Sequence, residues 1–529
     1  MPVQNLQNQT VSGEVRFLLI FVLTTGIFFR FINLDKKIVH FEEVYTLFRI
    51  AGYQDIEVVK ELYDGRVIEV SDLLKYQHTS PQKSLLNTIN SLAKEDSQHP
   101  PLYYIIARIW TEWFGTSVAV VRSLSAMISL FAFPCIYWLC LELFGEPIVG
   151  WTAVVLMAVS PFYVLFAQEM REYIFWAVTT LLSSAMLLRA MRLQTKFSWG
   201  IYAATVALGL YTFIFTVLNL LGHGIYVTLI ERFRLTKVYL AYLIASMIGI
   251  IGFLPWLWIM FNNLSQIRDT TSQFTSRLPI KTILKSIFGS PRYIFIDMKP
   301  YLFFHNILGV LVLILVCYSI YFICHHTAWK VWLFDLILIG SVVLPLLLAD
   351  LIIGGSRSTI YRYLITSLLG IQIAMAYLLA NRLTSSYAKK WQQKLWQLIA
   401  IALISGGIVS CGISSQAVIW WNKDNSYNPD FANIINQAAR PLVITDDRTK
   451  INQFTVTGDI MSLSYMLQPK VKLQLVVEPN IPKIPSGFSD IFLFNPSEAL
   501  RKGLEKQNYK IELIYHTEQD KSFWKLSQS

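Results

Sequence analysis

Long apolar runs separated by short polar connections dominate residues 1–420 of the chain. A helix that spans a bilayer needs about 20 mostly apolar residues, within a range of roughly 17 to 25. The pattern therefore predicts a polytopic α-helical membrane protein with about eleven transmembrane helices. We expect these helices near residues 15–33, 117–143, 147–166, 172–193, 197–212, 214–231, 238–261, 304–324, 331–353, 360–381 and 395–418.

One apolar stretch is too short to span the membrane, and its placement determines on which side of the membrane the later loops lie. Pro101 to Phe114 carries Arg108 and Glu112, so we predict a helix that lies in the membrane interface. With the N terminus inside, basic clusters then fall on the cytoplasmic side, as the positive-inside tendency requires. These clusters are residues 189–196, 231–237 and 381–394. The external face then receives residues 34–116, 167–173, 262–303 and 354–363.

The pattern changes after Trp420, where strand-like runs alternate with helix-like stretches. This alternation predicts a small α/β domain with a mostly parallel sheet over residues 420–529, outside the cytoplasm. Residues 1–419 form the predicted transmembrane domain, which includes the external loops 34–116 and 262–303. The expected strands are 441–447, 471–478, 490–496 and 511–516, and the expected helices are 430–439, 458–467 and 497–506.

Composition supports a membrane protein and argues against a nucleic-acid partner. The chain is 54% hydrophobic and 15% charged, and its mean hydropathy is +0.46. The net charge of +11 comes mostly from short clusters between apolar runs, with no basic face that carries interleaved aromatic residues. Membrane topology and anionic lipids therefore explain the charge better than nucleic acid does.

Two adjacent carboxylates, Glu42 and Glu43, follow the first apolar run, with Tyr45 beside them. The apolar spacing after them predicts an amphipathic helix with both acids in its first turn. Acids stabilise a helix N terminus by about 0.3–1 kcal/mol each, so a purely structural role is one alternative. The other is a carboxylate held at the water-lipid boundary, where it can act as a base.

Two further external segments carry candidate substrate-binding groups. "SQHPPLYY" places His99 at the start of the interfacial helix, where a helix start with interfacial tyrosines is the structural alternative. "AQEMREY" is a turn dense in charge, which is either functional or a set of helix-end charges that reach water. Its candidate residues are Gln168, Glu169, Arg171 and Tyr173.

Arginines mark the external edge of the tenth predicted helix, in "GGSRSTIYRYL". Arg357 and Arg362, with Tyr363, either anchor an aromatic belt or bind an anion. A guanidinium group matches a phosphate in two-point contact. Carboxylates on one external segment and arginines on another suit the transfer of a group from a lipid-linked phosphate to an acceptor.

The order of several motifs resembles a known family. These motifs are "HFEEVYT", "QHPPLYY", "VRSLSAMISLFAFPCIYWLCLELFG", "SPFYVLFAQEMREY", "LYTFIF" and "YRYL". Together they are similar to the bacterial branch of the dolichyl-phosphate-mannose protein mannosyltransferases, glycosyltransferase family 39 in the GT-C class. The resemblance implies a polyprenyl-phosphate sugar donor and a single inverting displacement outside the cytoplasm, in the plasma membrane of a bacterium.

The resemblance also assigns roles to individual residues. Glu42 stands where the family usually has aspartate and would be the general base, with Glu43 as the alternative base. Tyr45 and His99 would contact substrate. The turn residues Gln168, Glu169, Arg171 and Tyr173 would shape the sugar and acceptor side, and the lipid phosphate would meet Arg357, Arg362 and Tyr363.

Two rival functions and a metal stay open at this point. A transporter or flippase of lipid-linked saccharides would also need external arginines, although no internal repeat of the predicted helices is visible. A catalytically inactive relative would use its external domain only for binding. The acids could hold a divalent ion, but no close DxD motif is present and arginines can neutralise the phosphate. The acceptor would be a glycan, a lipid or a protein.

Overall fold

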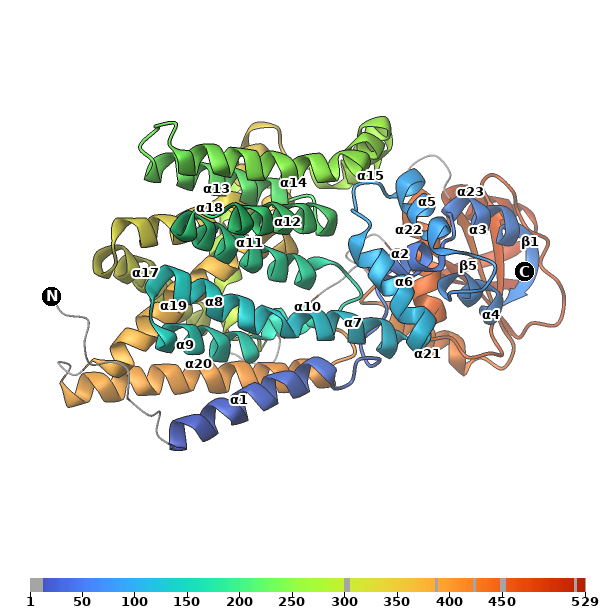
Figure 1. Ribbon diagram of the computed structural model, residues 1–529. Helices are drawn as coiled ribbons and strands as arrows, with labels where there is room; N and C mark the ends of the chain where they lie inside the picture. Colours follow the sequence, from blue (N-terminus) through green and yellow to red (C-terminus); the bar gives the residue numbers. More distant parts are fainter. Residues whose placement is uncertain are drawn as a thin grey trace. The chain divides into compact units, whose positions relative to one another are not determined.

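The computed structural model of the chain describes residues 13–298, 305–385, 389–421, 425–447, 453–517 and 521–528. These residues form two compact units. The helical unit contains the described residues up to 34, together with 122–258 and 271–416. The α/β unit contains residues 35–121, 259–270 and the described residues after 416. Figure 1 shows the helices of the first unit and the sheet of the second.

The helical unit follows the predicted apolar runs closely. Its main helices are α1 (Gly13–Phe31), α7 (Val118–Leu130), α8 (Ala132–Phe144), α9 (Pro147–Ala158), α10 (Pro161–Ala167), α11 (Tyr173–Leu193), α12 (Lys196–Thr212), α13 (Thr216–Ile230), α14 (Lys237–Asn262), α16 (Ile280–Gly289), α17 (His305–His326), α18 (Trp329–Ile352), α19 (Ile365–Thr384) and α20 (Lys390–Gln416). Short 3-10 turns are η2 (Ser272–Thr275), η3 (Ser290–Ile294), η4 (Arg357–Thr359) and η5 (Tyr361–Leu364). Residues 299–303 of the predicted loop 262–303 lie outside the described residues.

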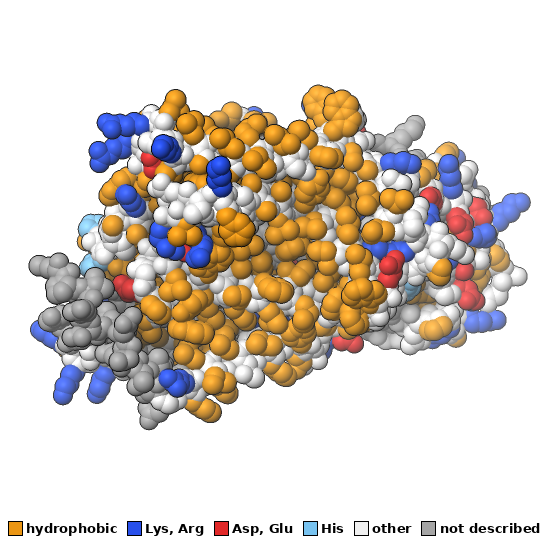
Figure 2. Space-filling model, in the orientation of Figure 1, with side chains coloured by type: hydrophobic (Ala, Val, Ile, Leu, Met, Phe, Trp, Pro, Cys, Tyr) orange, Lys and Arg blue, Asp and Glu red, His pale blue; other side chains and the backbone are white. Residues whose placement is uncertain are grey.

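The fold is that of a polytopic α-helical membrane protein, as predicted. Among the described residues, seven helices are long and apolar enough to cross a membrane, or eight with one bent pair. The predicted number of about eleven stays a prediction, because α12 and α13 have only 17 and 15 residues. In the span Tyr361–Thr384, which contains α19, 94% of the most apolar segment is buried, whereas the value for Lys237–Asn262 is 28%. The helix α19 therefore lies at the centre of the unit. On the face shown in Figure 2, hydrophobic side chains cover most of the helical unit.

The predicted span 147–166 is not one continuous helix. It breaks into α9 and α10, which are bent by 63°. Pro161 explains the break, because proline has no N–H to continue the helix and disfavours helical backbone at Ser160. The carbonyl groups of Met157 and Ala158 at the end of α9 accept hydrogen bonds from the buried guanidinium of Arg30, at 3.0 and 2.6 Å. Arg30 therefore satisfies groups that the break leaves without helical partners.

The α/β unit combines an N-terminal segment with the end of the chain. Its elements before the helical unit are α2 (Phe41–Ala51), α3 (Asp55–Leu62), β1 (Asp64–Glu69), α4 (Val70–Leu74), η1 (Lys75–Gln77), α5 (Leu85–Glu95) and α6 (Leu102–Phe114). Later elements are α15 (Leu264–Thr271), α21 (Asn428–Gln437), β2 (Pro441–Asp447), α22 (Gln453–Ser464), β3 (Lys472–Val477), β4 (Asp490–Phe494), α23 (Glu498–Lys506), β5 (Tyr509–His516) and β6 (Ser522–Gln528).

The six strands form one mixed sheet in the order β1-β3-β2-β4-β6-β5. Only the pairs of β2 with β3 and with β4 are parallel, and the other three pairs are antiparallel. The prediction of a mostly parallel sheet is therefore wrong. The cause is two strands that were not expected: β1 pairs antiparallel with β3 at one edge, and β6 lies between β4 and β5 and pairs antiparallel with both. The central strand β2 is buried along its whole length.

Strand β1 shows that residues 35–121 pack with the end of the chain. Its residues Asp64 to Glu69 pair with β3, and the partly buried Val67 packs on the core around Leu442, Ile444 and Leu493. The contacts thus group the first external segment with residues 417–529. The predicted division of the chain at residue 420 stays a prediction.

Candidate functional site

The two acids occupy different environments at the start of α2. The helix begins at Phe41 after an extended His40, which places Glu42 and Glu43 in its first turn. The side chain of Glu43 is fully buried, and its carboxylate lies 3.7 Å from Nε2 of His40. Glu42 is only partly buried. Adjacent residues point about 100° apart around a helix, so one acid faces the interior while the other keeps access to solvent.

The end of the chain fixes the N-terminal end of α2. The backbone N–H of Phe41 donates to Oδ1 of Asn425 at 2.6 Å. The hydroxyl of Ser462, on α22, donates to the carbonyl of Val39. The first bond satisfies an N–H that the helix start leaves without an internal partner, and the second holds the residue that precedes His40. The direction in which the acids leave the backbone is thus set by residues 384 and 423 positions later in the chain.

Tyr45 joins α2 to α22 through a direct contact with Gly458. A Cβ at Gly458 would lie 2.8 Å from the Tyr45 ring, so only glycine permits the observed spacing of the two helices. The ring is buried and makes an edge contact with Phe41, with centroids 6.2 Å apart. Burial raises the pKa of the Tyr45 phenol well above its ordinary value, and the phenol therefore stays neutral. Glu42 precedes Tyr45 by three residues, on a neighbouring part of the helix surface.

The opposite end of α2 is held by a buried charge cluster. Arg49 is fully buried and bonds Glu95 at 2.7 Å, while a carboxylate oxygen of Asp55 lies 3.4 Å away. Asp96 adds a third carboxylate at 3.9 Å. One guanidinium thus faces three acids. Burial, together with the charges of Glu95 and Asp96, raises the pKa of Asp55 to about 7 against the opposing effect of Arg49.

His99 belongs to the same unit and connects to this cluster. Its Nδ1 lies 2.7 Å from Oδ1 of Asp96, whose other oxygen faces Arg49. The helix α6 that follows carries Tyr104, with its ring 6.4 Å from the His99 ring. Among the predicted site residues, the α/β unit therefore holds Glu42, Glu43, Tyr45 and His99.

The turn 167–173, in the helical unit, is buried. Arg171 is 3% exposed and Glu172 is 0% exposed, so the alternative that these charges reach water is wrong. Arg171 donates to the carboxylate of Glu172 and to the hydroxyl of Tyr173, both at 3.2 Å. Glu169 is buried as well. The amide of Gln168 donates to the carbonyls of Phe29 and Ile32. Gln168 thus joins the turn to the end of α1.

Arg362 meets the same turn from η5. Its guanidinium lies 5.6 Å from the centre of the Tyr173 ring, against which the Arg171 guanidinium also packs at 5.3 Å. The Tyr363 ring lies 4.9 Å from that of Phe215 and 5.4 Å from the Arg362 guanidinium. The structure therefore brings together the predicted residues Arg171, Tyr173, Arg362 and Tyr363. Two guanidinium groups around one ring can supply several donors to a bound anion.

Arg357 is placed differently from Arg362. It donates to Asp350 at 3.4 Å and to the carbonyl of Gly354 at 3.2 Å. Asp350 also accepts from the backbone N–H of Ser358 at 2.7 Å. These contacts close the turn between α18 and η4, so they give Arg357 a structural task in addition to its predicted one.

Sequence reasoning missed three residues that shape the two units: Arg30, Arg49 and Asp350. Arg30 stands at the end of an apolar run, where an arginine is costly unless it is paired. That position was a usable signal. Arg49 and Asp350 gave no comparable signal, because their roles depend on partners that only the fold identifies. Within the described ranges, no three His, Cys, Asp or Glu side chains are placed to hold a metal ion together.

Comparison with known proteins agrees with the motifs. Residues 98–259 match the family described as dolichyl-phosphate-mannose-protein mannosyltransferase. The predicted family resemblance is confirmed. The matched range includes the mannosyltransferase-like motifs around His99 and Arg171, whereas the acid pair and Arg362 lie outside it. No curated protein matches the sequence significantly. The family is one of glycosyltransferases, so the match supports this activity without defining the sugar.

The solved structures of ArnT have the same fold. A crystal structure of ArnT from Cupriavidus metallidurans bound to undecaprenyl phosphate has a TM-score of 0.54 at 11% identity and covers 97% of this chain and 98% of that chain. The apo form of ArnT gives the same values. The oligosaccharyltransferase of Archaeoglobus fulgidus has a TM-score of 0.49 at 12% identity, over 87% of this chain and 65% of that chain. ArnT and this chain thus share a fold over nearly their full lengths.

Proposed function

We propose that the protein transfers a sugar from a polyprenyl-phosphate donor to a glycan, lipid or protein acceptor, with inversion, on the extracytoplasmic face of a bacterial plasma membrane. The observation that carries the proposal is the convergence of Arg171 and Arg362 on Tyr173, in a chain that matches a glycosyltransferase family. Binding of undecaprenyl phosphate by ArnT, which has the same fold, supports a lipid phosphate as the anion.

The proposed chemistry is one displacement. A carboxylate of the acid pair accepts the proton of the acceptor hydroxyl or amine, and the acceptor atom attacks the anomeric carbon. The bond from that carbon to the phosphate oxygen breaks, and the lipid phosphate leaves with the electron pair. Arg362 and Tyr363, with Arg171, stabilise the charge that develops on the phosphate. Gln168, Glu169 and Tyr173 shape the surroundings of the sugar and acceptor.

Glu42 is the proposed base, because it keeps partial exposure while Glu43 is fully buried beside His40. A base must reach the proton that it removes, and only an accessible carboxylate can meet an acceptor that arrives from solvent. Glu43 then has a positioning role through His40. Tyr45 and His99 would contact substrate from the same unit.

The test compares Glu42→Gln with Glu43→Gln in a membrane assay that follows release of polyprenyl phosphate. Removal of a general base costs about 10² to 10⁴ in rate, so Glu42→Gln should lose transfer at this scale while the protein stays folded. Glu43→Gln should lose less rate and more thermal stability. Normal transfer by Glu42→Gln would reject Glu42 as the base. Acceptor-independent movement of the intact donor across proteoliposomes would support a flippase instead.

The phosphate role has its own matched pair of variants. Arg362→Ala should weaken binding of undecaprenyl phosphate more than binding of the acceptor, because its guanidinium joins the cluster at Tyr173. Arg357→Ala should mainly lower thermal stability, since Arg357 closes a turn through Asp350. Equal losses of donor and acceptor binding in Arg362→Ala would argue against the phosphate role.

A further inference from the structure

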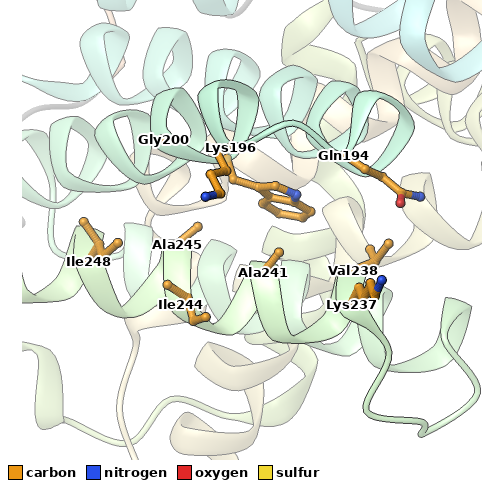
Figure 3. A pocket seen from close by; sticks show the side chains of 10 residues that line it. Gln194, Lys196, Gly200, Lys237, Val238, Ala241, Ile244, Ala245 and Ile248 are labelled. Atoms are coloured by element: carbon orange, nitrogen blue, oxygen red, sulfur yellow. The ribbon is translucent and has the colours of Figure 1, made fainter.

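A groove lies between the N-terminal halves of α12 and α14, on the side of the helical unit. Its volume is about 430 Å³. Lys196, Trp199 and Gly200 line it from α12, and residues from Lys237 to Ile248 line it from α14 (Figure 3). None of these residues has a role in the proposed transfer chemistry.

The groove exists because the two helices touch only farther along. A Cβ at Gly249 would lie 2.7 Å from Val206 and 2.9 Å from the carbonyl of Ala203, so the helices are in close contact there. The hydroxyl of Tyr211 adds a hydrogen bond to the carbonyl of Gly252 at 3.0 Å. Closer to the helix starts, a Cβ at Gly200 would meet no atom within 4 Å. The space beside Gly200 is therefore open.

The lining changes from charged to apolar along the groove. Lys196 and Lys237 stand in the first turns of α12 and α14, and both are exposed. Neither lysine forms an ion pair with another described residue. After Lys237 the α14 wall consists of Val238, Ala241, Ile244, Ala245 and Ile248. Ile244 and Ile248 are 60% and 57% exposed, although they are large apolar side chains.

The dimensions fit one leaflet of a bilayer. Lys237 and Ile248 are eleven residues apart on α14, which corresponds to about 16 Å along a helix. The hydrocarbon core of a bilayer is about 30 Å thick, so one leaflet contributes about half of this. An acyl chain that begins at the lysines would therefore end near Ile248. A polyprenyl chain that is longer than one leaflet would extend beyond the groove.

The positive charge of the two lysines favours a lipid with an anionic headgroup. The two lysines belong to the basic clusters 189–196 and 231–237, which the sequence places on the cytoplasmic side, and basic pockets on this side commonly bind anionic lipids. The positive ends of two helix dipoles add to their charge. A transmembrane helix of another protein would instead cover two lysines without supplying a counter-charge.

We propose that this groove binds one anionic diacyl phospholipid of the phosphatidylglycerol type. Its phosphate contacts Lys196 and Lys237, and one acyl chain lies along Ala241, Ile244 and Ile248. The bound lipid fills the space that α12 and α14 leave open and holds their separation constant.

Native mass spectrometry of delipidated protein tests the site with phosphatidylglycerol and phosphatidylcholine of identical chains. The wild type should retain one phosphatidylglycerol in preference to phosphatidylcholine. Each lysine near an anionic headgroup contributes roughly a fivefold preference, so Lys196→Gln with Lys237→Gln should reduce the preference about 25-fold. Lys330→Gln with Lys390→Gln is the matched control, because these exposed lysines begin α18 and α20 and do not line the groove.

Gly200→Phe tests the apolar part separately. The added ring fills the groove without a clash at its Cβ, so binding of either lipid should fall while thermal stability is kept. Unchanged phosphatidylglycerol preference in the double lysine variant would overturn the proposal. Displacement of phosphatidylglycerol by equimolar undecaprenyl phosphate would also overturn it, because the groove would then belong to the donor lipid. A loss of sugar transfer in Glu42→Gln does not bear on either result.

Discussion

The contact between Gly458 and Tyr45 yields a quantitative prediction about the acid-bearing helix. In Gly458→Ala the new Cβ would lie 2.8 Å from the Tyr45 ring, whereas ordinary contact begins near 3.4 Å. The two helices must therefore separate by about 0.6 Å. A 1 Å misplacement of reacting groups can cost about 10²-fold in rate, so we expect kcat/KM to fall roughly tenfold.

The stability of this variant should fall by no more than about 2.5 kcal/mol. Overpacking costs about 1–3 kcal/mol, but alanine in place of a helical glycine returns about 0.5–1 kcal/mol. Hydrogen exchange measured by mass spectrometry should show faster exchange in residues 41–51. A transfer assay on the same preparation then gives the activity of folded protein.

Gly503→Ala is the matched control in the same unit. Gly503 lies on α23, and its added Cβ would meet the end of the Ile481 side chain. We expect a similar or greater loss of stability, with unchanged exchange in residues 41–51 and unchanged kcat/KM. If Gly458→Ala folds and transfers sugar as fast as the wild type, then α22 does not position the acids, and this reasoning is refuted.

Two further predictions concern buried charges. The folded-state pKa of Asp55 is about 7, above its ordinary value of 3.8, so its protonation stabilises the α/β unit at low pH and this contribution is lost as the pH rises through about 7. Between pH 6 and pH 8 the free energy of unfolding of the unit should fall by about 1.4 kcal/mol. Asp55→Asn should remove this pH dependence, which thermal unfolding measures. An unchanged dependence in the variant would show that Glu95 or Asp96 carries the proton instead. Arg30→Met should cost about 1–3 kcal/mol, because two buried carbonyls at the end of α9 lose their donor, and an unchanged melting temperature would contradict this.

The periodicity of apolar residues predicted most helices and strands, because the side chains that an element buries follow from its local pattern of apolar and polar residues. The run 441–447 became β2 with the predicted bounds, and its short apolar part, Leu442 to Ile444, is fully buried in the sheet. Strand β1, with the sequence DGRVIE, lacks this pattern because it is an edge strand with several exposed residues. Its place in the sheet depends on β3, more than 400 residues later in the chain, and no local pattern contains that information.

The candidate site was predictable to the extent that chemistry is visible in single residues. Arginines and tyrosines at the ends of apolar runs indicated an anion site. Arg171 and Arg362 pack against Tyr173, and Tyr363 packs against Arg362. The bend between α9 and α10 had a visible signal in Pro161, but the continuous apolar run concealed it. Contacts such as Arg49 with Glu95 join positions 46 residues apart, so they follow only from the fold.

Burial of Glu43 argues against a purely structural role for the acid pair, in which both acids only stabilise a helix start. That role is worth about 0.3–1 kcal/mol for an exposed acid. The Glu43 side chain is fully buried, and removing a carboxylate from water costs several kcal/mol unless partners compensate it. A residue selected only to begin a helix would therefore be more favourable at the surface, as serine or aspartate usually is. The buried position of Glu43, with His40 3.7 Å from its carboxylate and a more accessible Glu42 beside it, favours a site in which one acid reacts and the other holds it in position.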